Sequence, residues 1–158
     1  MELKEDVHFL FQLEHFCRLH RQSLALKLAP YDVTPGQIPL LICLWDQEGV
    51  SQKELLQQVD IEQPTLANTL KRMQRDELVK AERDGNDRRK VIYRLTYRGK
   101  KAKTVVQAAL NDVQSICETN LSVTDIKYFT RILEQMTQRL KQDILDPTLI
   151  LADIVPEE

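Results

Sequence analysis

The chain has 158 residues, of which 42% are hydrophobic and 29% charged, and its formal net charge is −2. This length suits one domain with a buried core, and four glycines and six prolines are few enough to favour long helices. The three scattered cysteines exclude a disulfide framework, and no apolar run approaches the roughly 18 residues of a membrane span. The acidic start, MELKED, lacks the apolar segment of a signal peptide, so we expect a cytoplasmic protein with no membrane partner.

The first part of the chain predicts two helices. Apolar residues recur at helical spacing from Asp6 to Leu28, and Pro30 ends this helix. Residues 34–37, Thr-Pro-Gly-Gln, form a helix start with Thr as N-cap. The helix that follows, to about Glu48, is apolar nearly all round, which predicts a central position in the fold.

Residues 51–77 predict a helix-turn-helix. Ser51 to Glu54 is a capping box that starts a short helix, and a turn leads to a longer helix ending at about Asp76. Leu66, Leu70 and Met73 recur at i, i+4 and i+7 and should point inward.

The outer face of the second helix carries polar and basic residues, as a helix that reads the DNA major groove needs. The residues predicted to contact bases are Gln63, Thr65, Asn68 and Thr69. The residues predicted to contact phosphate in this region are Ser51, Lys71, Arg72 and Arg75. An ordinary polar helix face is the alternative interpretation.

Residues 79–95 predict a hairpin with a charged loop. Val91, Tyr93 and Leu95 alternate with Ile92 and Arg94, which indicates a strand. We predict that Arg89 enters the minor groove and that Asp87 braces it, because a carboxylate that holds the long side chain lowers its ordering cost. We predict phosphate contacts for Arg88 and Lys90. A solvated charged turn is the alternative.

The charge distribution supports a nucleic-acid partner. Residues 51–105 hold 14 Lys+Arg and 8 Asp+Glu, whereas the rest of the chain holds 8 and 16. One basic region on an otherwise acidic chain is typical of a protein with one phosphate-binding face.

Two long helices and a tail complete the chain. The first runs from about Arg98 to Thr119, and Ser122 caps the second, which Pro147 ends. Each carries an apolar stripe. Residues 147–158 form an apolar tail, which either packs on a partner or is a frayed end.

Residues 51–99 resemble the winged helix-turn-helix of the MarR family of bacterial transcription regulators. The matching segments are SQKELLQQV, IEQPTLANTLKRMQRDELV and DGNDRRKVIYRLTYRG. The family's Asp-spacer-Arg wing pattern maps onto Asp87 and Arg89, and its Leu-Thr-two residues-Gly signature ends at Gly99. The order of the flanking helices extends the resemblance to about Asp146. The chain departs from the family at Glu77, where a Gly in the left-handed conformation is usual.

The resemblance implies a mainly α fold with a small β wing and a homodimer. Residues 1–34 and 98–146 would form the helical dimerisation region, and residues 35–97 the DNA-binding region. A two-fold dimer places two reading helices on a pseudo-palindromic operator, with half-sites about 10 bp apart. The expected function is that of a transcriptional regulator, specifically a repressor that a small ligand releases from its operator. Its expected partners are double-stranded DNA and a second copy of itself.

Relatives suggest two kinds of signal. A small aromatic or phenolic effector would bind between the dimerisation and reading regions, in a pocket that the family layout places at Phe16, His20 and Trp45. A thiol sensor in the first helix is the alternative, and Cys17 is its candidate. We interpret Cys17 as a buried structural residue, and Cys43 and Cys117 as core residues.

Other functions find little support in the sequence. It contains no nucleophile with a base, no glycine-rich phosphate loop and no zinc-ligand spacing, so we expect neither an enzyme nor a bound cofactor or metal. The histidines of the first helix, including His8 and His15, are interpreted as surface residues. A protein-interaction module with an acidic partner is the other alternative, which rests on the apolar tail.

Overall fold

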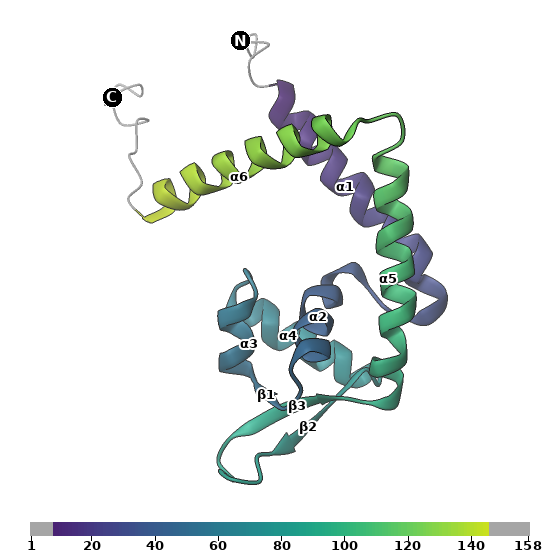
Figure 1. Cartoon of the computed structure of the whole chain (residues 1–158). Helices are drawn as coiled ribbons and strands as arrows, with labels where there is room; N and C mark the ends of the chain where they lie inside the picture. Colours follow the sequence, from purple (N-terminus) through teal and green to yellow (C-terminus); the bar gives the residue numbers. More distant parts are fainter. Residues whose placement is uncertain (1–7, 146–158) are drawn as a thin grey trace, which may run out of the picture. The chain divides into compact units, whose positions relative to one another are not determined.

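The structure is a computed structural model that describes residues 8–145. The elements in chain order are α1 (His8–Leu28), η2 (Ala29–Tyr31), η3 (Pro35–Gln37), α2 (Ile38–Asp46), β1 (Val50–Ser51), α3 (Gln52–Gln58), α4 (Gln63–Arg75), β2 (Val79–Arg83), β3 (Val91–Leu95), α5 (Tyr97–Cys117) and α6 (Val123–Leu145). The predicted mainly α fold with a small β wing is confirmed (Figure 1). The chain divides into two compact units, one ending at Ser115 and one beginning at Ile116. The predicted apolar tail lies outside the described residues.

Capping residues determine where the helices begin. Ser51 is the N-cap of α3: its Oγ accepts the Glu54 N–H at 3.3 Å, and the Glu54 carboxylate accepts the Ser51 N–H at 2.7 Å. This confirms the predicted capping box. The helix start predicted at Thr34 is only partly confirmed. The Thr34 N–H donates to Gln37 Oε1 at 2.8 Å, but the first turn is the 3-10 helix η3, and α2 starts only at Ile38.

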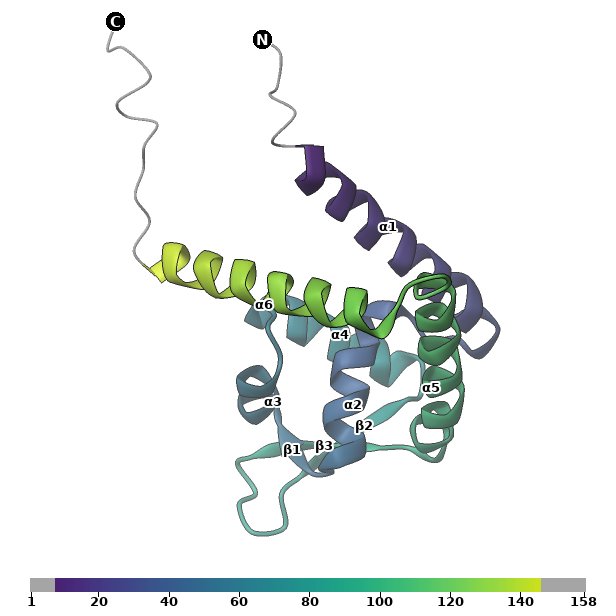
Figure 2. The same cartoon turned by 45° about the horizontal axis from the view of Figure 1, so that its top comes forward.

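Helix α2 lies between α3 and α5 in the first unit, which confirms its predicted central position (Figure 2). Its residues Leu40, Leu41 and Leu44 have no exposed surface. Burying each such side chain contributes about 1.5–3 kcal/mol, so α2 supplies a large share of the core. The buried residues that α4 and α5 add to this core are Leu66, Leu70, Met73, Ala102, Val106, Ala109 and Val113.

The sheet contains three antiparallel strands in the order β1-β3-β2. The predicted hairpin is present, with Val79 opposite Leu95 and Arg83 opposite Val91. The third strand, β1, was not predicted, because two residues are too few to show a period of two.

The predicted alternation of side chains between the two faces of β3 does not match their burial at Val91, where the strand leaves the loop. Val91 is 38% exposed, whereas Ile92 is 4% exposed. β1 pairs with β3 only opposite Ile92 and Tyr93. Val91 therefore lies beyond the part of the strand that β1 covers.

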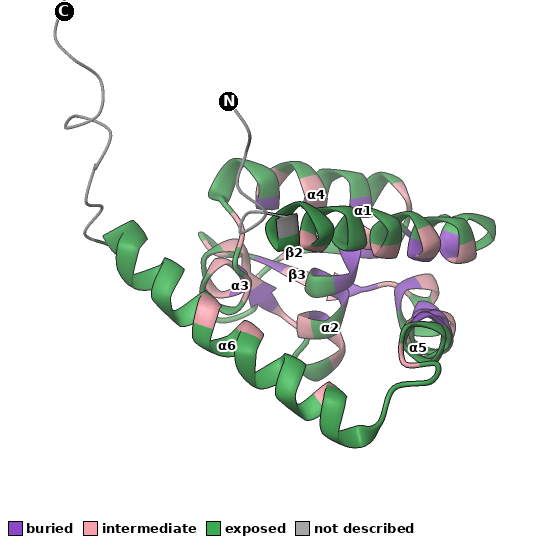
Figure 3. Cartoon of the chain, turned by 90° about the horizontal axis from the view of Figure 1, so that it is seen from above, coloured by how far each residue is buried: buried purple, intermediate pink, exposed green. Residues whose placement is uncertain are grey.

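Several long helices keep apolar residues on the surface of the single chain. No described residue of α6 is buried, and Phe129, Leu140 and Ile144 are all more than half exposed (Figure 3). Among residues 9–28 of α1, only Leu24 and Leu28 are buried. The apolar stripe of α5 is buried in the core, whereas that of α6 and most of the apolar surface of α1 are present but uncovered. Within residues 8–145, no helix combines the length and apolar character required to cross a membrane.

Helix α4 ends in the left-handed turn that the family resemblance anticipated. Glu77 has φ +55°, its N–H donates to Gln74 O at 3.1 Å, and the Leu78 N–H donates to Met73 O at 2.8 Å. These two bonds form a Schellman motif. The cap therefore keeps its usual form even though Glu77 carries a Cβ that disfavours this conformation.

Replacing Glu77 with glycine should stabilise the protein by about 1 kcal/mol, because glycine adopts positive φ without steric cost. For a chain of this size we expect a rise in melting temperature of roughly 2–4 °C. Thermal unfolding followed by circular dichroism measures it. Glu77→Ala is the matched control: it removes the same carboxylate but keeps a Cβ. An equal rise in both variants would contradict the conformational explanation.

Candidate nucleic-acid interface

The helix-turn-helix consists of α3 and α4, and α4 presents its predicted reading face to solvent. Its inner face is closed by the buried residues Leu66, Leu70 and Met73. Helical geometry turns the remaining positions outward. The predicted contact residues of α4 that are exposed are Gln63, Thr65, Asn68, Lys71, Arg72 and Arg75.

Thr69 differs from the other predicted base-contacting residues. It is half-buried, and its hydroxyl donates to the carbonyl oxygen of Thr65 at 2.8 Å. A hydroxyl has one proton, so in this arrangement Thr69 offers a base only its lone pairs and its methyl group. In the structure, therefore, the Thr69 hydroxyl is not available to donate a hydrogen bond to a base.

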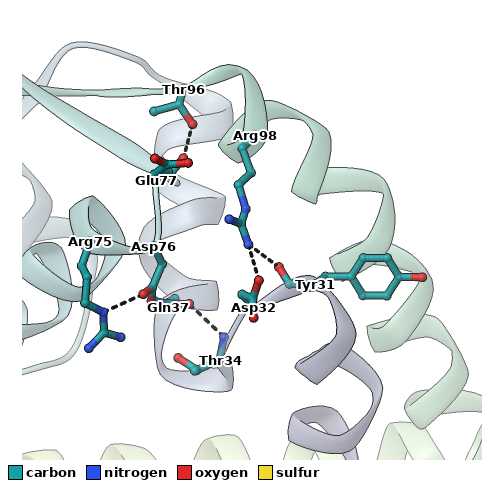
Figure 4. A network of polar contacts seen from close by, with 9 residues as sticks. All are labelled: Tyr31, Asp32, Thr34, Gln37, Arg75, Asp76, Glu77, Thr96 and Arg98. Carbon is teal, nitrogen blue, oxygen red and sulfur yellow. Dashed lines mark hydrogen bonds and ion pairs between the residues drawn. The ribbon is translucent and has the colours of Figure 1, made fainter.

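The C-terminal end of α4 is tied to the start of α2. Arg75 Nε donates to Asp76 Oδ1 at 2.8 Å, and the Arg75 side chain remains 72% exposed. Gln37 Nε2 donates to Asp76 Oδ2 at 2.9 Å (Figure 4). Gln37 is only 1% exposed, and sequence analysis assigned it only a local capping role. A contact across 39 positions of sequence leaves no local pattern by which to predict it.

The loop between β2 and β3 extends beyond the sheet and is shaped by its own hydrogen bonds (Figures 1 and 2). Asp84 Oδ1 accepts the Asn86 N–H at 2.8 Å, and Asp87 Oδ1 accepts the Arg89 N–H at 2.9 Å. Asp87 was predicted to brace the Arg89 guanidinium; instead it holds the Arg89 backbone, as in an Asx turn. Among residues 8–145, neither Arg88 nor Arg89 takes part in a side-chain ion pair, and both are exposed.

Two residues predicted to contact phosphate, Ser51 and Lys90, also make contacts within the protein. Lys90 Nζ forms an ion pair with Glu54 Oε1 at 2.9 Å, and Ser51 Oγ donates to Glu54 Oε2 at 2.7 Å. Glu54 therefore joins the start of α3 to the base of the wing. The Ser51 hydroxyl gives its single proton to Glu54, whereas Lys90 uses one of its three ammonium protons there and keeps the others for a phosphate.

The contacts of Glu54 predict a dependence of stability on pH. The backbone N–H of Ser51, followed by Lys90, lowers the pKa of Glu54 from 4.5 to about 2. A lowered acid pKa stabilises the fold above the unfolded value, and the stabilisation is lost as pH falls from about 4.5 towards 2. In urea unfolding, the parent should exceed Glu54→Gln in stability above pH 5, and the gap should shrink over this acidic range. A gap that is independent of pH would contradict the role of the charge.

The predicted ligand pocket is not supported. Phe16 and His20 stack with ring centroids 6.1 Å apart, but Phe16 is 45% exposed. Trp45 packs against the core, and its Nε1–H donates to the Gly99 carbonyl oxygen at 2.9 Å. A pocket of about 220 Å³ in the first unit contains none of these three residues. It is lined by Pro30, Tyr31, Asp32, Leu78, Arg98, Lys101, Ala102 and Val105.

The cysteine predictions were wrong in two of three cases. Cys17 and Cys117 are exposed, whereas Cys43 is half-buried and packs against the core. Cys17 lies on α1, where only Leu24 and Leu28 are buried among residues 9–28, and Cys117 lies beside the exposed Ile116 at the end of α5, past the buried part of its apolar stripe. Burial, followed by the nearby Asp46 carboxylate, raises the pKa of the Cys43 thiol, so this residue is not an activated nucleophile.

Comparison with known proteins identifies the family. The sequence model of the MarR family matches residues 33–91. The chain is 30% identical to the HTH-type transcriptional regulator MgrA of Staphylococcus aureus over 103 residues, which cover 65% of this chain and 69% of MgrA.

Solved structures show the same fold. The chain superimposes on the S. aureus MepR–DNA complex with a TM-score of 0.75 at 20% identity, covering 87% of this chain and 99% of that one. It superimposes on Bordetella bronchiseptica BpsR, whose DNA binding is regulated by 6-hydroxynicotinic acid, with a TM-score of 0.73 at 21% identity, covering 87% and 96%. The curated relatives are transcriptional regulators, in agreement with the prediction that the chain is not an enzyme. The match to the family's sequence model and the extent of the similarity to MgrA show that the chain belongs to the MarR family of transcriptional regulators.

Proposed function

We propose that this protein is a dimeric, sequence-specific DNA-binding regulator that represses transcription and is released from its operator by a small ligand. The observation that carries the proposal is the presence of two separate cationic elements, the outer face of α4 and the loop between β2 and β3. Each leaves arginine side chains exposed: Arg72 and Arg75 on α4, and Arg88 and Arg89 on the loop. A reading helix in the major groove with a loop in the adjacent minor groove would use both.

Binding to DNA from the region next to the protein's own gene tests the proposal. Fluorescence anisotropy should show saturable binding to one fragment, and the logarithm of the affinity should fall linearly with the logarithm of salt concentration, with a slope of about 0.9 per neutralised phosphate. Deleting the gene should raise transcription from that promoter if the protein is a repressor. Failure to bind any genomic fragment at low salt would contradict DNA binding.

Dimerisation is supported by the uncovered apolar stripe of α6. Phe129 and Ile132 are 52% and 45% exposed on a helix with no buried described residue. We expect light scattering to give twice the chain mass of 18.4 kDa. Phe129→Asp combined with Ile132→Asp should yield monomers, whereas Gln138→Asp, on the opposite face of the same helix, should not. A monomeric parent protein would contradict this part of the proposal.

An aromatic acid is the effector class that the pocket in the first unit favours. Lys101 supplies a cation for a carboxylate, whereas the charge of Arg98 is already paired with Asp32 at 2.8 Å, and Leu78, Ala102 and Val105 supply apolar contacts for a ring. We expect 6-hydroxynicotinic acid or a related aromatic acid to lower DNA affinity, and Lys101→Ala to weaken that response without weakening DNA binding itself to the same degree. DNA affinity that no aromatic acid changes would remove the effector from the proposal.

The two alternative functions receive less support. The protein-interaction module rested on the apolar tail, which lies outside the described residues. Cys17 is exposed and so accessible to oxidants, but accessibility alone does not make a thiol a sensor.

A further inference from the structure

We propose that Gln37, a buried residue outside the helix-turn-helix, is a positioning residue for DNA binding. It acts through Asp76 to hold the guanidinium of Arg75 ready for phosphate. The inference rests on the proposed DNA-binding function and adds to it a residue that contacts no DNA. Three side chains from two separate segments carry the argument (Figure 4).

The orientation of the Gln37 amide is fixed by its partners. Its Oε1 accepts the Thr34 backbone N–H at 2.8 Å, and a backbone N–H can only donate. The amide nitrogen therefore faces Asp76, where Nε2 donates to Oδ2 at 2.9 Å. Because Gln37 is 1% exposed, this amide is held in place by the core around it.

Asp76 passes this constraint to Arg75. One carboxylate oxygen is bound to Gln37, and the other accepts from Arg75 Nε at 2.8 Å. The Asp76 side chain is only 15% exposed, so its charge is turned inward and away from an approaching phosphate. The hydrogen bond from Arg75 has the largest effect on the Asp76 carboxyl and lowers its pKa, and the bond from Gln37 acts in the same direction. The bridge is therefore ionised at neutral pH.

Using Nε in this bond leaves the two terminal nitrogens of Arg75 for DNA. A guanidinium has five N–H donors, of which the four on the terminal nitrogens form the fork that binds phosphate oxygens. The Arg75 side chain is 72% exposed, so this fork is accessible. Ordering the arginine during folding reduces the conformational entropy that would otherwise be lost on binding DNA.

A double-mutant cycle on DNA affinity tests the inference. Gln37→Met keeps the length of the side chain but removes the amide, and should weaken operator binding about three- to tenfold, on the order of one lost orienting hydrogen bond. In an Arg75→Ala background the same change should have less than a twofold effect. In an Arg72→Ala background it should keep its full effect, because the Arg72 side chain has no bond to Asp76 among the contacts of residues 8–145. NMR should also show faster hydrogen exchange at Arg75 Nε–H in Gln37→Met.

The outcomes separate this inference from the proposed function. Absence of DNA binding by the parent chain would overturn both. If the parent chain binds, equal losses from Gln37→Met in the Arg75→Ala and Arg72→Ala backgrounds would overturn only the positioning role, since a general loss of structure acts on both alike. Unchanged affinity in Gln37→Met would overturn it as well. Should Gln37→Met fail to fold, Asp76→Ala breaks the same bridge and is measured in the same two backgrounds, with the same criteria.

Discussion

Replacing Gly99 with alanine should destabilise the protein by about 3 kcal/mol, at the upper end of the cost of overpacking a core. An ideal Cβ on Gly99 would lie 2.0 Å from the Leu78 carbonyl oxygen and 3.1 Å from Leu95 Cδ2. The carbonyl cannot move aside freely, because it accepts bonds from the Thr96 N–H at 3.1 Å and the Thr96 hydroxyl at 3.2 Å. The first turn of α5 must therefore shift away from the base of the wing.

The shift would also disturb two bonds made by Gly99 itself. Its N–H donates to Thr96 Oγ1 at 3.0 Å, and its carbonyl oxygen accepts from Trp45 Nε1 at 2.9 Å. These bonds join the first turn of α5 to Thr96, the residue between β3 and α5, and to Trp45 of α2. The resemblance located this glycine as the end of a family signature, and the close approach to Leu78 supplies the physical reason for it.

Urea unfolding measures the loss of stability, and thermal unfolding should show a fall in melting temperature of roughly 6–12 °C. Gly36→Ala is the matched control, because a Cβ at Gly36 meets no atom within 4 Å. It should change stability by less than about 0.5 kcal/mol. A Gly99→Ala protein as stable as Gly36→Ala would show that the backbone adjusts at little cost, contrary to this argument.

Features set by local sequence were predicted well. The Ser51–Glu54 capping box and the buried positions Leu66 and Leu70 of α4 depend on residues within four positions of one another. Helical periodicity and capping chemistry are local signals, so a single sequence carries them.

Features set by distant contacts were not predicted. β1 exists because Val50 and Ser51 pair with β3, some forty positions later in the chain. Gln37 meets Asp76 across 39 positions, and Lys90 meets Glu54 across 36. Polar side chains of this kind look like solvated residues or local caps until the fold brings them together.

The cysteines show a different limit of sequence reasoning. Apolar spacing predicted burial of Cys17 and Cys117, and both are exposed in the single chain. Periodicity identifies the face of a helix that avoids water, but it does not say whether the same chain or another copy covers that face.

Replacing Arg89 with alanine should weaken operator binding by about 1–3 kcal/mol, or roughly 5- to 150-fold in affinity. The guanidinium of Arg89 is exposed on the loop between β2 and β3, where a narrow minor groove would offer the most negative potential. Folding should be unaffected, because an exposed loop side chain contributes little to stability. Fluorescence anisotropy measures the affinity, and thermal unfolding confirms the fold. Binding equal to that of the parent chain would contradict the minor-groove role.

Asp87 decides how Arg89 is positioned, and two variants separate the predicted mechanism from the one the structure supports. If the carboxylate charge held the guanidinium, Asp87→Asn and Asp87→Ala would weaken binding alike. In the structure Asp87 Oδ1 instead accepts the Arg89 backbone N–H at 2.9 Å, and an asparagine oxygen can accept the same bond. Asp87→Asn should therefore bind DNA at least as tightly as the parent, because it also removes a negative charge near phosphate.

Asp87→Ala should bind more weakly than Asp87→Asn by about 1 kcal/mol, the usual contribution of one hydrogen bond. Equal losses of affinity in the two variants would restore the side-chain brace and remove the backbone one.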